Sequence, residues 1–398
     1  MQMKYQHSLL PQPEMLEVKS TSKKLRIGIP FEQDKNENRI AITPLAVELL
    51  VAQGNEVFIE KGAGERSNFS DNDFSEKGGQ ITDSRPIIFQ SDVILKVSPL
   101  TPEEIALLKG NQLLISAINI GTGTKEYLLS LMRKRITTVG YELIQDDQKS
   151  LPVVRSMSEI IGSTAVLKAA EYLSHSGIGK GKILGGITGV NPSEVVILGS
   201  GTAAEHAARI ALGLGAVVKV FDHSIYRLGR LQNNIYQRVF TSIIQPTILA
   251  NAIQTADIII GALDMMDPAS RYIISEDLVM QMKKGSVIID TSIDQGGCFE
   301  TSRVTSHQDP IYIEHGIVHY CVPNIASTVA RTASYALSNI FAPILSKMGD
   351  SASLSSFIKY NYGFRQGVYI YNGILTNNQI GSYFDIPSKD IDLLVAAM

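Results

Sequence analysis

Residues 195–222 decide the fold of this chain; they are VVILGSGTAAEHAARIALGLGAVVKVFD. An apolar strand leads into the turn 199–204, which has the pattern G-x-G-x-x-A, and a helix and a second apolar strand follow. Gly-rich turns alone are common, but here strand, turn, helix, second strand and a closing acid occur in order. Together they predict a βαβ unit that binds a dinucleotide.

Each small residue of the turn has a physical role in this prediction. Gly199 permits the tight turn, Gly201 lets a pyrophosphate approach the backbone, and Ala204 keeps the helix close to the strand. The phosphates are expected on the unpaired N–H groups of the helix N-terminus, where Thr202 and Ala203 lie. Gly199, Gly201, Thr202 and Ala203 are therefore candidate cofactor-binding residues.

The closing acid, Asp222, predicts which dinucleotide binds. It follows Gly201 by 21 residues, at a place where a carboxylate accepts a hydrogen bond from the ribose 2′-OH and repels a 2′-phosphate. This favours NAD over NADP. Arg227 lies nearby and leaves two interpretations open, because an arginine here either holds a 2′-phosphate or remains a solvated helix residue.

Short apolar runs alternate with helical stretches along most of the chain. Before the Gly-rich turn, the pattern predicts strands at 26–30, 56–60, 92–97, 112–117 and 136–143, and helices at 44–54, 102–108, 125–135 and 157–176. Thr43-Pro44 supplies an N-cap and a first-turn proline for the first helix. After a Gly-rich loop the alternation restarts, which predicts an α/β fold of two doubly wound, Rossmann-like domains.

Composition narrows the class of protein. A chain of 398 residues is too long for one core and predicts about two domains. Its 36 Lys and Arg against 39 Asp and Glu show no basic excess that would attract nucleic acid. The apolar runs are too short to span a bilayer, and the first 24 residues lack the features of a signal peptide. Two cysteines and scattered histidines predict no disulfide framework and no metal site, and a cytoplasmic location is expected.

Polar residues follow the later strands. Asp290 and Asp294 lie where a strand runs into a Gly-Gly turn, and open α/β sheets place ligands at such carboxyl ends. Either aspartate could instead be a turn carboxylate without chemistry. Asn324 likewise could hold a carboxamide or simply close a turn.

Several longer segments together indicate a family. They are RIGIPFEQDKNENRIAITP (26–44), EKGAGERSNFSD (60–71), MSEIIG (157–162), GSGTAAEHAARIALGLGA (199–216), IDQGGCFE (293–300) and CVPNIASTVARTASYAL (321–337). Through them, from about residue 25 to 390, the chain resembles alanine dehydrogenase and, more distantly, the NAD-binding subunit of proton-translocating transhydrogenase. The MSEIIG and IDQGG segments favour the dehydrogenase.

The resemblance implies two domains with a cleft between them. The substrate domain is expected to be discontinuous, from 25–155 and 330–398, with the NAD-binding domain at 156–329 and an N-terminal extension at 1–24. The implied activity is reversible, NAD-dependent oxidative deamination of L-alanine to pyruvate and ammonia. A homo-oligomer, hexamer or dimer, is also expected.

The resemblance also assigns roles to particular residues. Arg39 matches the family's arginine that holds the substrate carboxylate, and a guanidinium suits this task because its fork meets a carboxylate bidentately. Asp294 matches the active-site aspartate near the substrate nitrogen. Ser158, Asp222 and Asn324 match positions that contact the cofactor.

Two positions depart from the family pattern. Ser98 stands where the family has a lysine that grips pyruvate, and Asn119 stands where it has its acid/base histidine. Since residues two apart on a strand share a side, Lys96 is hypothesised to reach the place of the missing ammonium; alternatively it pairs with a surface carboxylate.

Three kinds of protein therefore remain open. The first is an alanine dehydrogenase-like enzyme, or a related dehydrogenase for another amino acid. The second is an NAD(H)-binding regulatory paralogue without turnover. The third, a transhydrogenase-type subunit, is the least favoured, because its partner-facing loop is not present.

Overall fold

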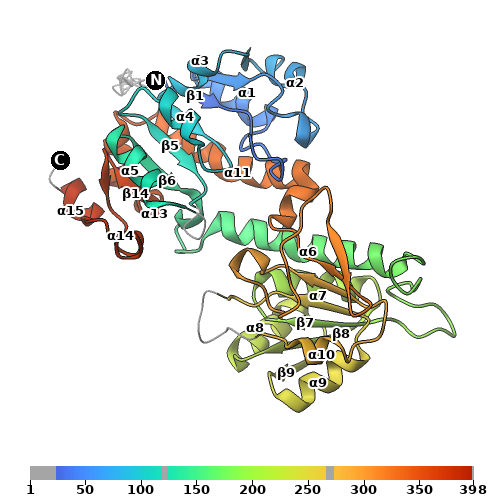
Figure 1. The fold of residues 1–398 in the computed structure, drawn as a ribbon. Coiled ribbons are helices and arrows are strands. Elements are labelled where there is room, and N and C mark those ends of the chain that lie inside the picture. Colours follow the sequence, from blue (N-terminus) through green and yellow to red (C-terminus); the bar gives the residue numbers. More distant parts are fainter. Residues whose placement is uncertain (1–23, 119–122, 266–272, 397–398) are drawn as a thin grey trace, which may run out of the picture.

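Two β-sheets with flanking helices make up the molecule. The computed structural model describes residues 24–118, 123–265 and 273–396 (Figure 1). The predicted α/β class with two Rossmann-like halves is confirmed. Asn119 lies outside the described residues.

The first sheet has eight strands in the order β15-β14-β6-β5-β4-β1-β2-β3. The parallel strands are β1 (Arg26–Ile29), β2 (Glu56–Glu60), β3 (Gln80–Thr82), β4 (Val93–Leu95), β5 (Leu113–Ser116) and β6 (Thr137–Gly140). Two strands from the end of the chain complete it, because β14 (Val368–Tyr371) pairs antiparallel with β6, and β15 (Ile374–Leu375) pairs antiparallel with β14. The first domain is therefore discontinuous.

The second sheet has seven strands in the order β12-β13-β11-β10-β7-β8-β9. They are β7 (Glu194–Leu198), β8 (Val217–Asp222), β9 (Phe240–Ile243), β10 (Ile258–Gly261), β11 (Val287–Asp290), β12 (Ile311–Glu314) and β13 (Ile317–Tyr320), of which only β12 is antiparallel. Strand order reverses between β7 and β10, and open sheets bind ligands beyond the carboxyl ends of strands at such a reversal. The Gly-rich turn follows β7.

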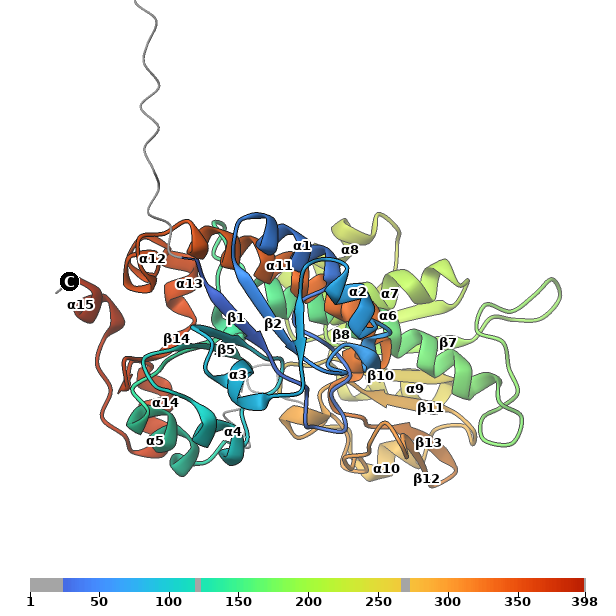
Figure 2. The same cartoon turned by 90° about the horizontal axis from the view of Figure 1, so that it is seen from above.

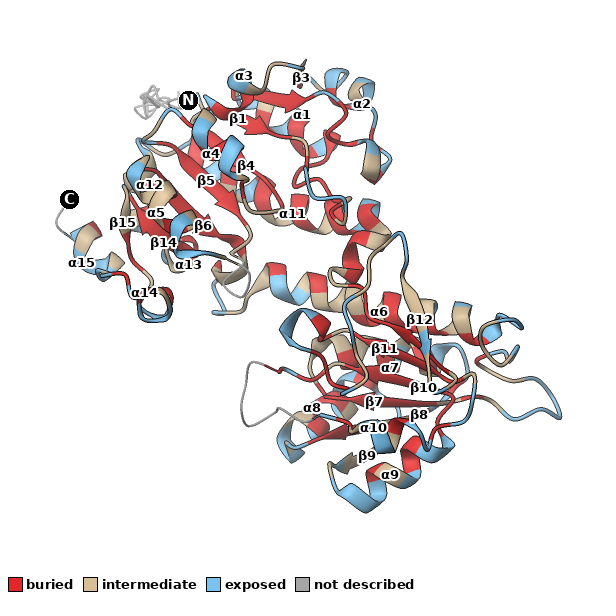
Figure 3. Ribbon diagram, viewed as in Figure 1, coloured by how far each residue is buried: buried red, intermediate tan, exposed pale blue. Residues whose placement is uncertain are grey.

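Helices cover both sheets and connect them. In the first domain these are α1 (Pro44–Ala52), α2 (Asp71–Ser75), α3 (Arg85–Phe89), α4 (Pro102–Leu107), α5 (Lys125–Arg133), α12 (Leu354–Tyr360), α13 (Tyr362–Gln366), α14 (Asn378–Phe384) and α15 (Ile391–Ala396). The second has α7 (Thr202–Gly213), α8 (Ile225–Ile235), α9 (Pro246–Thr255) and α10 (Glu276–Val279). Most strand residues are buried, as expected for parallel strands with helices on both faces (Figure 3).

Two long helices link the domains. α6 (Pro152–Ser174) runs from the first sheet to the second, and α11 (Ala330–Gly349) packs on α1 after the chain returns (Figures 1 and 2). α6 packs closely on α7 at Gly162, where a Cβ would lie 2.0 Å from the carbonyl oxygen of Ala203. The glycine of MSEIIG thus brings α6 to the start of α7.

The structure differs from the local predictions in three details. The strand predicted at 136–143 ends at Gly140, and a 3-10 turn, η2 (Tyr141–Leu143), follows it. The strand predicted at 92–97 ends at Leu95. Thr43 occupies the N-cap position, but its hydroxyl lies 3.0 Å from that of Ser338 on α11 and does not cap the helix. At Thr43 a tertiary contact replaces the local cap.

Candidate active site between the two domains

A pocket of about 440 Å³ lies between the two domains. The first domain contributes Arg39, Tyr141 and Glu142 to its wall. The second contributes the start of α7 and the ends of β10 and β11, and α6 lies between them. Its predicted site residues are Arg39, Ser158, Gly201, Thr202, Ala203 and Asp294. The pocket therefore brings together candidate residues far apart in sequence.

The Gly-rich turn has the geometry that a pyrophosphate requires. Gly199 has φ 105°, and a Cβ there would lie 2.3 Å from the carbonyl oxygen of Ala262. A Cβ on Gly201 would meet no described atom within 4 Å, so the backbone is open to a ligand. Gly201 is also the N-cap of α7 and gives it no side-chain cap, which leaves first-turn N–H groups for an anion. A nicotinamide dinucleotide fits this cradle.

Asp222 ends β8 beside the turn. Its Oδ2 accepts a hydrogen bond from the hydroxyl of Ser200 at 2.7 Å, and its Oδ1 accepts one from the backbone N–H of Ser224 at 2.8 Å. These bonds fix a buried carboxylate next to the Gly-rich turn, and each oxygen keeps a further lone pair for a ribose hydroxyl. Arg227 lies in the first turn of α8, half-buried, and its backbone N–H donates to the Ser224 hydroxyl at 3.2 Å.

Arg39 is held by a carboxylate that the sequence analysis missed. Its Nε and Nη2 donate to Glu37 at 2.7 and 2.6 Å, and its Nη1 lies 3.2 Å from Sδ of Met157. Burial opposes ionisation of Glu37, but the charge of Arg39 and the hydrogen bonds from Arg39 and Asn324 together outweigh it and hold the pKa of Glu37 below its usual value. A thioether is a weak acceptor, so Nη1 is the edge of the guanidinium with bonding capacity left for a ligand.

Asn324 supports this pair from the other side. Its Nδ2 donates to Oε2 of Glu37 at 2.8 Å, and the nearby Ser327 hydroxyl accepts from the backbone N–H of Asn38 at 2.7 Å. Asn324 has φ 59°, in the left-handed region that asparagine tolerates. It does not line the pocket, so the structure places it behind the candidate carboxylate site.

The two aspartates after β11 have different environments. Asp290 is buried and accepts from the N–H of Cys298 at 2.8 Å and from the hydroxyl of Ser302 at 2.6 Å, which is the arrangement of a turn carboxylate. Asp294 lies in a 3-10 turn (Ile293–Gln295), lines the pocket and is accessible to solvent. Partial desolvation by the pocket wall raises the pKa of Asp294.

Glu142 is a second functional candidate that the sequence analysis missed. The η2 turn places it on the pocket wall, where its two carboxylate oxygens accept from the backbone N–H of Ile118 at 3.0 and 3.1 Å. Burial raises the pKa of Glu142 to about 7, against the bonds from the backbone and the charge of Arg39. Its position near the carboxyl end of a predicted strand was the available signal.

Lys96 does not reach the pocket. Its side chain is 1% exposed, and Nζ lies 2.7 Å from Oε2 of Glu104 and 3.3 Å from the carbonyl oxygen of Pro99. The backbone N–H of Lys96 donates to the carbonyl oxygen of Ile115 on β5 at 3.0 Å, and its ammonium lies against α4. The partner of Lys96 is therefore Glu104, a buried carboxylate on α4, and not a surface carboxylate.

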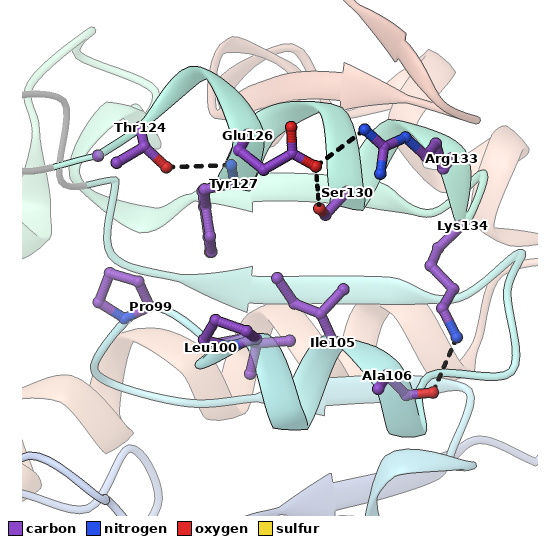
Figure 4. A pocket seen from close by; sticks show the side chains of 12 residues that line it. Pro99, Leu100, Ile105, Ala106, Thr124, Glu126, Tyr127, Ser130, Arg133 and Lys134 are labelled. Atoms are coloured by element: carbon purple, nitrogen blue, oxygen red, sulfur yellow. Dashed lines mark hydrogen bonds and ion pairs between the residues drawn. The ribbon is translucent and has the colours of Figure 1, made fainter.

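A larger cavity of about 640 Å³ lies between α4 and α5 (Figure 4). Its wall is mainly apolar, and some of its polar groups bond within the protein: Oε1 of Glu126 lies 2.8 Å from Nη2 of Arg133, and Nζ of Lys134 donates to Ala106 at 2.8 Å. None of the predicted site residues lines it.

Two further features follow from the described residues. Within 24–118, 123–265 and 273–396, no group of three or more His, Cys, Asp and Glu side chains could hold a metal ion. No helix of this part of the chain is long and apolar enough to cross a membrane.

The chain has a Rossmann domain with an open Gly-rich turn, and this domain faces a second domain across a pocket. These features define a two-domain protein that binds a nicotinamide cofactor. Family models agree: the N-terminal domain of alanine dehydrogenase/PNT matches residues 28–161, and the C-terminal domain matches residues 165–378. The chain belongs to the alanine dehydrogenase/PNT family, as the sequence resemblance indicated.

Individual relatives cover nearly the whole chain. An alanine dehydrogenase of Methanococcus maripaludis is 36% identical over 363 residues, 91% of this chain and 97% of that protein. One of Staphylococcus haemolyticus is 34% identical over 92% of this chain and 98% of its own length. A solved L-alanine dehydrogenase superposes with a TM-score of 0.84 at 34% identity, covering 91% of this chain and 99% of its own. A transhydrogenase from Sinorhizobium meliloti, at 22% identity and a TM-score of 0.74, shows the shared fold alone.

Proposed function

We propose that this chain is an NAD-dependent amino-acid dehydrogenase that catalyses the reversible oxidative deamination of L-alanine to pyruvate and ammonia. The observation that carries the proposal is the single pocket in which Arg39 and Asp294 face the uncapped start of α7. We further propose that 25–155 with 330–398 forms the substrate domain, that 156–329 forms the NAD domain, and that the protein acts in the cytoplasm as a homo-oligomer, either hexamer or dimer.

The cofactor-binding residues would be Ser158 on α6, the turn 199–203 and Asp222, with Asn324 supporting the site from behind Glu37. Bound NAD⁺ would supply the acceptor for the hydride of the substrate Cα. In the first domain, the Glu37 carboxylate fixes the plane of the Arg39 guanidinium, so that Nη1 can meet a substrate carboxylate. Asp294 would lie toward the substrate nitrogen. The chain's own residues thus orient the substrate at both ends.

The preference for NAD gives a specific prediction about Asp222. Asp222→Ala should weaken NADH binding by roughly 10- to 150-fold, because hydrogen bonds to a charged group contribute about 1.5–3 kcal/mol. The substitution should also narrow or reverse the difference in affinity between NADH and NADPH, since the repulsion of a 2′-phosphate is removed. Fluorescence titration measures both dissociation constants. Asp277→Ala, an exposed aspartate of the same domain, is the control. Tighter binding of NADPH than NADH by the unmodified protein would contradict the assignment.

The activity is tested by NAD⁺ reduction with purified protein and a panel of L-amino acids at alkaline pH. We expect L-alanine-dependent NADH formation. Oxidation of a different amino acid alone would show that Ser98 and Asn119 mark a changed substrate. If NADH binds and no amino acid in the panel is oxidised, the proposal is wrong and the protein is a regulatory NAD(H)-binding member of its family.

A further inference from the structure

Deamination requires several proton transfers in the pocket. When water adds to the carbon of iminopyruvate, a C–O bond forms and an O–H bond of the water breaks. The nitrogen must then gain a proton before the C–N bond breaks and ammonia leaves. The hydroxyl must finally lose its proton as the C=O bond of pyruvate forms. A group that both accepts and donates protons near neutral pH is therefore needed.

Glu142 is positioned for this exchange. Its carboxylate is held from one side by the N–H of Ile118, at the carboxyl end of β5, and it lines the pocket that also contains Arg39. One bond to each oxygen leaves further lone pairs for a water or a substrate nitrogen. The residue is half-buried because its remaining surface faces the pocket.

Within the described residues, charged and titratable groups of the first domain lie around Glu142. Arg39 acts on it from the loop after β1, Tyr141 precedes it, and Tyr369 contributes from β14. Burial raises the pKa of each tyrosine well above the usual value, so neither side chain ionises near neutral pH. Asp294 lies on the other domain's wall of the same pocket.

We propose that Glu142 is the proton-transfer residue of this pocket, a role that rests on the proposed function. Its carboxylate accepts the proton of the attacking water, donates it to the nitrogen of the carbinolamine, and then accepts the hydroxyl proton as ammonia leaves. That last proton passes to ammonia or to solvent, so one iminium ion and one water yield one pyruvate and one ammonium ion. The role needs no histidine.

The titration of Glu142 suits this role. Burial raises the pKa of Glu142 to about 7, so the carboxyl is partly ionised at neutral pH and serves in both directions. In the direction of alanine oxidation the ionised form is needed. The rate should therefore fall as the pH drops below about 7.

The test is the Glu142→Gln variant, which keeps the size and an acceptor for the Ile118 N–H. Because loss of a general acid/base costs about 10²–10⁴-fold in rate, kcat of Glu142→Gln should fall by this factor. The decline of its rate below about pH 7, which is the acid limb of the pH–rate profile, should also disappear. Glu142→Asp should keep that limb at an intermediate rate. Formate should partly rescue Glu142→Ala, which a purely structural role would not allow. The dissociation constant for NADH should stay within about threefold in all variants.

The outcomes separate this inference from the proposed function. If the unmodified protein oxidises alanine, and Glu142→Gln keeps both its rate and its pH limb, the inference is wrong and the function stands. If Asp294→Asn removes the limb instead, Asp294 is the proton-transfer group and the inference is again wrong. If the unmodified protein binds NADH but oxidises no alanine, the proposed function fails first, and this inference fails with it.

Discussion

Replacing Arg39 by leucine should lower kcat/KM for L-alanine by about 10²–10³-fold, mainly through KM. The physical reason is the loss of charge-assisted hydrogen bonds to the substrate carboxylate, each of which contributes about 1.5–3 kcal/mol. NADH binding should change by no more than about threefold, since the Gly-rich turn belongs to the other domain. Steady-state kinetics and fluorescence titration on the same preparation measure both quantities.

A matched variant separates charge from geometry at this position. Arg39→Lys keeps the positive charge and loses the planar fork, so its kcat/KM should fall between those of the unmodified protein and Arg39→Leu. Arg39→Leu also leaves Glu37 buried at 3% exposure without its cation, which should cost about 3–5 kcal/mol of unfolding free energy. Circular dichroism must therefore show a folded variant at the assay temperature. An unchanged KM for alanine in folded Arg39→Leu would show that Arg39 does not bind the substrate.

The second large effect is expected on stability, at Glu104. This carboxylate is fully buried and accepts from Lys96 at 2.7 Å, from Arg85 at 2.7 Å and from the backbone N–H of Thr101 at 2.8 Å. Glu104→Leu leaves the Lys96 ammonium buried without its anionic partner, although it still donates to the Pro99 carbonyl oxygen at 3.3 Å. The unfolding free energy should fall by about 3–5 kcal/mol, measured by urea denaturation.

A double variant identifies the cause of this loss. Lys96→Met with Glu104→Leu removes both buried charges and should recover most of the stability, because an apolar pair of similar volume replaces the ion pair. The exposed pair of Lys77 and Glu48, 3.0 Å apart, is the control, and Glu48→Ala should cost less than about 1 kcal/mol. A loss of no more than about 1 kcal/mol in Glu104→Leu would contradict this account. The double variant should also retain catalysis, since Lys96 lies outside the pocket.

The Gly-rich turn was predictable because its constraints are local. The left-handed φ of Gly199 and the open face of Gly201 follow from the spacing of small residues between an apolar strand and a helix. The same local pattern predicted both sheets. It could not place β14 beside β6, because that pairing joins residues more than 200 positions apart; the discontinuous first domain was indicated only by the family resemblance.

The missed residues lie where the chain leaves a strand. The alternating pattern predicted one strand at 136–143, which includes Glu142. In the structure the strand ends before this residue, and the turn at Tyr141 directs Glu142 to the pocket. A similar prediction at the end of β4 directed the Lys96 ammonium to the pocket, although it lies against Glu104. Glu37 was overlooked because its function depends on the conformation of Arg39, two residues later. Strand ends are fixed by tertiary contacts that no sequence period reports.

The most direct test of the central claim is hydride transfer from the substrate Cα. The purified protein is incubated with NAD⁺ and L-alanine deuterated at Cα, and the products are examined by NMR spectroscopy and mass spectrometry. We expect deuterium at C4 of the nicotinamide ring and an equal amount of pyruvate. Protein that binds NADH, yet yields neither labelled cofactor nor pyruvate, would contradict it.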